Sequence, residues 1–129
     1  MEAAAPFRYR SFPLSLHAGK DALSQLRAEV GRAKARRAFV ICGKSIATRT
    51  DLKDRVQANL GDKYAGVFEG VETSSPLPGV LAGAAAGRAA DADLIVAIGG
   101  GSAMVTARAI IILLAEKKDI HDLCTQYPP

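Results

Sequence analysis

The chain has 129 residues, 49% of them hydrophobic, and a formal net charge of +4. That length and composition suffice for one domain with a buried core, and no apolar run approaches the roughly 18 residues of a membrane span, so no membrane partner is expected. The N-terminus lacks the apolar core of a secretion signal and the two cysteines stand far apart, so we expect a cytoplasmic protein with reduced thiols.

The first third of the chain predicts a strand, a helix and a second strand. Apolar residues alternate loosely over residues 7–16, which indicates a strand, or a strand pair interrupted at Pro13. Apolar residues at helical spacing predict an amphipathic helix over residues 21–34. The run at 38–42 is apolar throughout, which is typical of a strand buried on both faces.

The middle of the chain continues this alternation. A helix is expected from Thr50 or Asp51 to about residue 60, followed by a short strand at 64–68. Residues 69–79 are rich in Pro, Gly and Ser and predict a loop. A helix of small residues should then run from residue 77 or 80 to residue 90, and its lack of bulk would let it lie close against a sheet.

A strand, a glycine turn and a helix start come next. The apolar run at 94–98 predicts a buried strand over residues 93–98, and three glycines follow it: Gly99, Gly100 and Gly101. Glycines let an anion approach the backbone, and the free N–H groups and dipole of a helix N-terminus attract it. Ser102 would cap a helix that continues to about residue 114, and its hydroxyl could donate to a phosphate oxygen. The alternative is a tight turn without a ligand, because Met104 occupies the third glycine position of the G-x-G-x-x-G fingerprint.

Together these elements predict an α/β fold, a Rossmann-like and mostly parallel sheet with helices on both faces, in a single domain. We expect a nucleotide-binding domain over residues 1–118 and a C-terminal tail over 119–129. Ligands of such sheets bind at the carboxyl ends of the strands. Those ends are the 69–76 loop and two segments that supply the candidate cofactor-binding residues: Gly43, Lys44 and Ser45, and Gly99, Gly100, Gly101 and Ser102.

The glycine turn also resembles a known signature. Asp93, Ala97, the three glycines, Ser102 and Ala107 match the pattern D-x-x-x-A-x-G-G-G-S-x-x-D-x-A-K of the iron-containing alcohol dehydrogenases, a family that includes maleylacetate reductase and glycerol dehydrogenase. The resemblance covers residues 12–116. It implies that the turn wraps the pyrophosphate of NADP or NAD, and that the chemistry is hydride transfer between the nicotinamide and an alcohol or carbonyl.

The chain departs from the family pattern near the expected cofactor. Val105 replaces the signature aspartate, as in the maleylacetate reductase branch, and Arg108 replaces the lysine. Gly43 stands where the family often has an acidic residue that holds the adenosine ribose. Because glycine leaves room for a 2′-phosphate that Lys44 and Ser45 could contact, the site is expected to tolerate or prefer NADP; the alternative is that Lys44 is a solvated loop lysine.

The resemblance further implies an iron or zinc ion held by one aspartate and three histidines of a helical C-terminal domain, which this chain lacks. The only histidines, His17 and His121, stand far apart, so no metal site is expected here. No residue is a convincing general acid or base, because Lys44 and Arg108 suit contacts with phosphate or solvent. We therefore assign no catalytic residue.

Three functions stay open. The chain is the NAD(P)-binding half of such an oxidoreductase and inactive alone, or a stand-alone nucleotide-binding or regulatory module, or an interaction domain that forms a homodimer through an open sheet edge. A nucleic-acid partner is not expected, because the cations between Arg27 and Arg37 have no aromatic residue among them for base stacking and are typical of a solvated helix end.

Overall fold

A parallel sheet forms the middle layer of the molecule, in a computed structural model that describes residues 8, 10, 11 and 13–124. Strand β1 (Ala38–Gly43) lies between β2 (Tyr64–Val71) and β3 (Leu94–Ile98) and pairs in parallel with both. The predicted α/β fold with a parallel sheet is thus confirmed.

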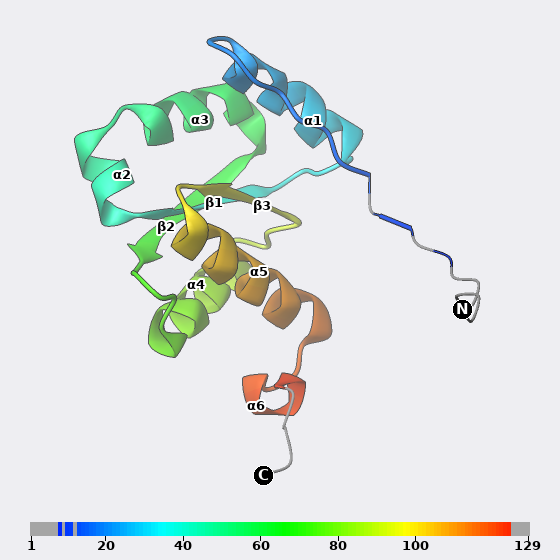
Figure 1. The fold of residues 1–129 in the computed structure, drawn as a ribbon, viewed down its shortest axis with the longest axis vertical. Helices are drawn as coiled ribbons and strands as arrows, with labels where there is room; N and C mark the ends of the chain where they lie inside the picture. The colour runs from blue at the N-terminus through cyan, green and yellow to red at the C-terminus, as the bar shows by residue number, and fades with distance from the viewer. Residues whose placement is uncertain (1–7, 9, 12, 125–129) are drawn as a thin grey trace, which may run out of the picture.

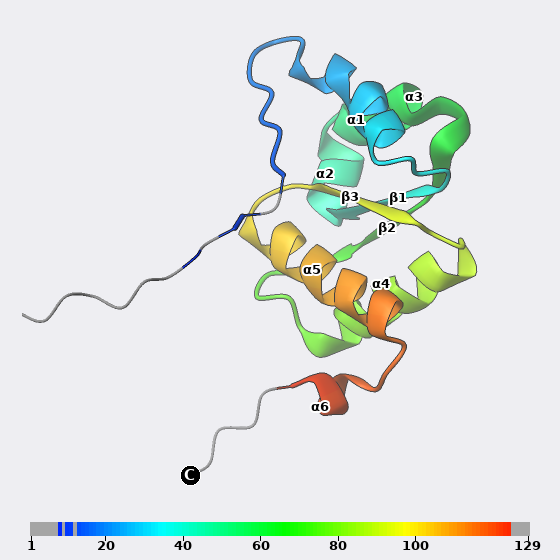
Figure 2. The ribbon, with the colours of Figure 1, turned by 90° about the vertical axis from the view of Figure 1, so that its right-hand side faces the viewer.

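Helices cover both faces of this sheet, as Figure 2 shows. One face carries α1 (Leu26–Arg32), α2 (Lys44–Arg49) and α3 (Leu52–Leu60). The other face carries α4 (Leu77–Ala89) and α5 (Gly101–Glu116), with α6 (Ile120–Leu123) beyond them (Figure 1). Short 3-10 helices precede α1 and β2, at Ala22–Gln25 and Gly61–Lys63.

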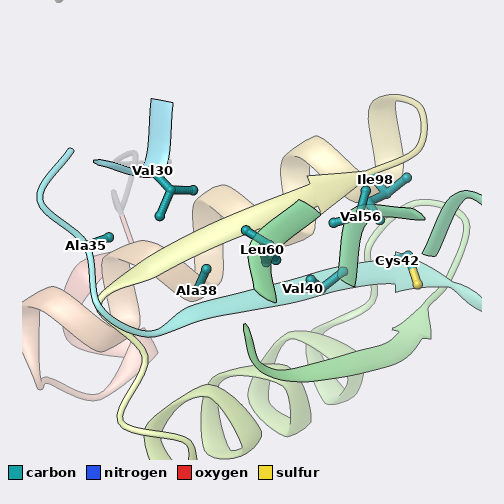
Figure 3. Packing of buried hydrophobic residues seen from close by; sticks show 8 residues of the cluster. All are labelled: Val30, Ala35, Ala38, Val40, Cys42, Val56, Leu60 and Ile98. Carbon is teal, nitrogen blue, oxygen red and sulfur yellow. The ribbon is translucent and has the colours of Figure 1, made fainter. Parts of the chain in front are cut away.

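Strand β1 contributes to two hydrophobic cores, because successive side chains of a strand point to opposite faces. Ala38, Val40 and Cys42 pack with residues of α1 and α3, among them Val56 and Leu60 (Figure 3). Phe39 and Ile41 pack with residues of α4 and α5 on the other face. All five β1 side chains are at most 3% exposed, and full burial of a Val, Ile or Phe side chain stabilises the fold by about 1.5–3 kcal/mol.

Helix α4 lies close to α5 because its buried face consists of small residues. A Cβ atom on Gly83 would lie 2.5 Å from Cδ1 of Ile110 and 3.1 Å from Cδ1 of Phe68. Gly83 and Ala84 are both buried in this contact. The approach to Phe68 of β2 confirms that this small-residue helix packs closely against the sheet, as expected, and the approach to Ile110 adds a close contact with α5.

The predicted N-terminal strand is wrong for the part that the structure describes. Residues 8, 10, 11 and 13–16 form no strand, and Leu14 and Leu16 are 90% and 87% exposed. A strand needs a pairing partner, and within the described part of the chain β1, β2 and β3 pair only with one another. Residues 7, 9 and 12 of the predicted strand lie outside the described residues.

Several predicted boundaries also change. Strand β2 continues through residues 69–71, which were expected in a loop, and α4 begins at Leu77. Helix α2 was not expected, and α6 forms a helical turn within the predicted tail, whose residues 125–129 lie outside the described residues. The domain boundary at residue 118 stays a prediction.

No helix among the described residues combines the length and apolar character needed to cross a membrane.

Candidate functional site

The carboxyl ends of the three strands lie level with one another. Gly43, the last residue of β1, pairs with Val71, the last residue of β2, and Cys42 pairs with Ile98, the last residue of β3. The loops that leave the strands therefore begin at one edge of the sheet. This register brings together the segments that the sequence singles out.

The turn after β3 needs glycine at its first position. Gly99 has a φ of +139°, a conformation that L side chains rarely adopt, and a Cβ there would lie 3.1 Å from that of Ala103. Gly100 is extended, and a Cβ built on Gly100 or Gly101 would meet no atom within 4 Å. The turn therefore leaves open space directly in front of the N-terminus of α5.

The N-terminus of α5 presents free backbone donors to that space. The first intrahelical bond is donated by the N–H of Met104 to the carbonyl of Gly100 at 3.2 Å, so the N–H groups of the three residues before it have no acceptor within the helix. No side chain caps this end. An anion placed here would accept hydrogen bonds from these N–H groups and would be attracted by the helix dipole.

Ser102 lies in the first turn of α5, so its predicted role as N-cap is wrong. Gly100 is the N-cap, because Gly101 already has helical conformation. The hydroxyl of Ser102 instead accepts the N–H of Ser74 at 3.3 Å, and its carbonyl accepts the hydroxyl of Ser75 at 2.9 Å. These bonds hold the loop after β2 against the glycine turn, and the Ser102 hydroxyl keeps its proton for a ligand.

A hollow of about 310 Å³ lies between these loops. It is lined by six of the seven predicted cofactor-binding residues, together with Ile46, Val71, Glu72, Thr73, Ile98 and Ala103. Its volume is at the lower end of the range of about 300–1,000 Å³ for ligand pockets, so it matches part of a dinucleotide better than the whole. The binding role of its residues stays a prediction.

The segment after β1 contributes Gly43 and Ser45 to this hollow but not Lys44. A Cβ on Gly43 would lie 3.3 Å from the carbonyl oxygen of Val71, which explains a small residue at this position. Lys44 is the first residue of α2, and its side chain is exposed. Glu72 and Thr73 belong to the 69–76 loop that the sequence places at this edge, but sequence reasoning did not single them out as lining residues.

The titratable groups behind the hollow form no catalytic constellation. Burial raises the pKa of the Cys42 thiol, which is 0% exposed and therefore unsuited to act as a nucleophile. Lys53 Nζ donates to Glu69 Oε1 at 2.8 Å, and this hydrogen bond raises the pKa of Lys53. Both ions are therefore engaged with each other rather than with the hollow.

The histidines lie in different surroundings and do not meet. His17 Nε2 lies 2.8 Å from Glu29 Oε1 beside α1, and the backbone N–H of His121 donates to Asp119 at the start of α6. Among the residues placed by the structure, no group of three His, Cys, Asp or Glu side chains could hold a metal ion.

The same chain is similar to known proteins over most of its length. The family described as iron-containing alcohol dehydrogenase matches residues 13–129. Maleylacetate reductase 2 of Cupriavidus pinatubonensis is 40% identical over 101 residues, which are 78% of this chain and 27% of that protein. The chain thus spans little more than a quarter of this relative's length.

Solved structures agree with this similarity. A maleylacetate reductase from Agrobacterium tumefaciens is 27% identical and superposes with a TM-score of 0.73, covering 84% of this chain and 30% of that structure. A maleylacetate reductase from Rhizobium sp. strain MTP-10005 gives 29% identity and the same TM-score, covering 83% of this chain and 30% of the other. The Rossmann-like character of the sheet and helices is thereby confirmed.

Proposed function

Because this chain belongs to the iron-containing alcohol dehydrogenase family, a family of oxidoreductases, we propose that it forms the NAD(P)-binding part of an enzyme of the maleylacetate reductase type. The bound nicotinamide would supply the hydride that passes to or from a carbonyl or alcohol. The iron or zinc ion that would polarise that oxygen belongs, in this proposal, to a C-terminal domain outside this chain.

One observation carries the proposal: level strand ends bring an uncapped helix N-terminus and an open glycine turn to one hollow. The free N–H groups of α5 and the hydroxyl of Ser102 would hold the pyrophosphate. Gly43 and Ser45 would lie beside the adenosine half. These residues would bind and orient the dinucleotide, and we assign none of them a catalytic proton transfer.

A second candidate is a nucleotide-binding or regulatory module without catalysis. It is favoured by the same hollow, whose lining holds no acid–base pair, and by the small share of the relatives that the chain spans. Both candidates require dinucleotide binding. They differ in whether a joined C-terminal domain gives turnover.

Replacing Gly100 by Val tests dinucleotide binding. The φ of Gly100 is −92°, which valine can adopt, and a Cβ there meets no atom within 4 Å, so the variant should fold. Its side chain would occupy the space of the pyrophosphate and should lower NADH and NADPH affinity more than tenfold in a fluorescence titration. Gly31→Val, on the open surface of α1, is the matched control. Unchanged affinity in a folded Gly100→Val variant would reject this site.

A further inference from the structure

Among the residues that the structure describes, Glu72 is the only charged one that lines the hollow at the carboxyl ends of the strands. It follows Val71, the last residue of β2, and its backbone carbonyl accepts the N–H of Ser75 at 3.1 Å. This bond fixes the turn that carries Glu72. Its carboxylate takes part in no hydrogen bond or ion pair with the other described residues, and its side chain is exposed.

The position of Glu72 suits contact with the adenosine half of a dinucleotide. The sheet order places β1 between β3 and β2, so β2 lies two strand spacings, about 10 Å, from β3. With the adenosine half beside Gly43, as in the proposed function, a pyrophosphate held at the N-terminus of α5 would place the attached ribose across the end of β1. Gly43 at that end has no side chain to block the path toward Glu72.

We propose that Glu72 makes this site selective for NADH over NADPH, by accepting hydrogen bonds from the adenosine ribose hydroxyls and repelling a 2′-phosphate. This inference rests on the proposed dinucleotide site. It reverses the preference expected from Lys44, because Lys44 lies outside the residues that line the hollow and Glu72 lies among them. A carboxylate about 5 Å from a phosphate with nearly two charges should change affinity roughly five- to tenfold in dilute buffer.

The test measures the dissociation constants of NADH and NADPH separately, by fluorescence titration of the purified chain. The native chain should bind NADH more tightly, and Glu72→Gln should raise NADPH affinity relative to NADH by roughly five- to tenfold. The gain should shrink at high salt, because salt screens the repulsion. Glu116→Gln, which removes the same charge at the far end of α5, about 22 Å from its N-terminus, is the control.

The outcomes separate this inference from the proposed function. If both dinucleotides bind and Glu72→Gln leaves their affinity ratio unchanged, the inference is overturned and the dinucleotide site stands. A ratio that moves in Lys44→Ala but not in Glu72→Gln also overturns it and restores the expected 2′-phosphate contact. If neither dinucleotide binds to the folded chain, the proposed function fails and the inference fails with it.

Discussion

At the scale of single residues, Asp93 shows how one side chain of the family signature supports the sheet. Its carboxylate accepts the backbone N–H of Arg36 at 2.9 Å and that of Arg37 at 2.8 Å, just before β1 begins. Asp93 itself directly precedes β3. The signature aspartate therefore joins the starts of two neighbouring strands, at the opposite end of the sheet from the glycine turn.

These bonds predict a specific pH dependence for Asp93. The hydrogen bonds from Arg36 and Arg37 hold its pKa below the usual value, so its contribution to stability is present above the ordinary aspartate pKa of about 4 and is lost as pH falls through the lowered pKa. Asp93→Asn should lower the free energy of unfolding at pH 7, and its difference from the native chain should narrow between about pH 5 and pH 3. Urea unfolding at several pH values measures this.

Asp91→Asn provides the control for that experiment. Asp91 is exposed two residues earlier and has a φ of 48°, a conformation that asparagine adopts as readily as aspartate. Its replacement removes the same charge but none of the two strand-joining hydrogen bonds. An equal loss of stability in both variants at pH 7 would show that charge, not the bonds of Asp93, is responsible.

Sequence reasoning found the residues of the candidate site whose backbone conformation requires glycine, and it did not single out Glu72. Gly99 was predictable because only a residue without a Cβ suits its positive φ, and apolar runs on either side locate the turn. Glu72 was not predictable as a lining residue, because its place depends on how a loop folds back through Ser74 and Ser75. The prediction of Ser102 as N-cap is wrong because Gly101 already belongs to the helix, so one glycine fewer than expected lies before it.

At the scale of elements, a matched pair of glycine substitutions measures the contact between α4 and α5. Alanine favours a helix over glycine by up to about 1 kcal/mol at both Gly31 and Gly83. At Gly31 the added methyl meets nothing, so Gly31→Ala should stabilise the chain. At Gly83 it would lie 2.5 Å from Cδ1 of Ile110, and such overpacking costs about 1–3 kcal/mol.

The expected result is therefore that Gly83→Ala has a lower unfolding free energy than Gly31→Ala by about 1–3 kcal/mol, since the gain in helix propensity cancels between them. Equilibrium unfolding in urea gives both values. Equal stabilities would contradict the close approach of the two helices.

Elements buried on both faces were predicted well, and exposed or short ones were not. Strand β1 is an apolar run whose first five residues are buried, and β3 is an apolar run that is half-buried up to Ala97 and buried at Ile98. Helix α2 has only six residues and buries none completely, so it leaves little hydrophobic periodicity to detect. The alternating pattern before residue 17 predicted a strand that the described residues of this segment do not form, because alternation indicates a possible buried face and not the presence of a pairing partner.

At the scale of the whole molecule, the sheet has two roles: its centre stabilises the fold, and the carboxyl ends of its strands carry the candidate site. Its centre, β1, is enclosed by helices and carries the cores, whereas β3 pairs on one side only within the described sheet. The predicted homodimer through an open sheet edge stays a prediction, and β3 offers such an edge. The level carboxyl ends carry the candidate site, so a stable sheet positions loops that are themselves exposed.

The small number of metal-ligating side chains that lie together predicts that the chain holds no tightly bound metal by itself. A tight iron or zinc site needs at least three protein ligands in reach of one ion. His17 and His121 are the only histidines of the sequence, and the structure assembles no such group among the residues it describes. We expect metal analysis of the purified chain, after dialysis against a chelator and then against buffer, to find far less than one equivalent of iron or zinc.

The chain purified without the chelator step, and supplied with iron or zinc, should bind a nicotinamide dinucleotide and show no turnover of it with maleylacetate, the compound for which the relatives are named. The reason is that the residues lining the hollow can hold a pyrophosphate but provide no group to polarise a carbonyl oxygen. Binding without turnover would agree with a cofactor-binding part that depends on further residues for catalysis. One equivalent of retained metal would instead show a ligand set that the metal prediction missed, and dinucleotide oxidation that disappears in Gly100→Val would show that the chain carries a complete active centre.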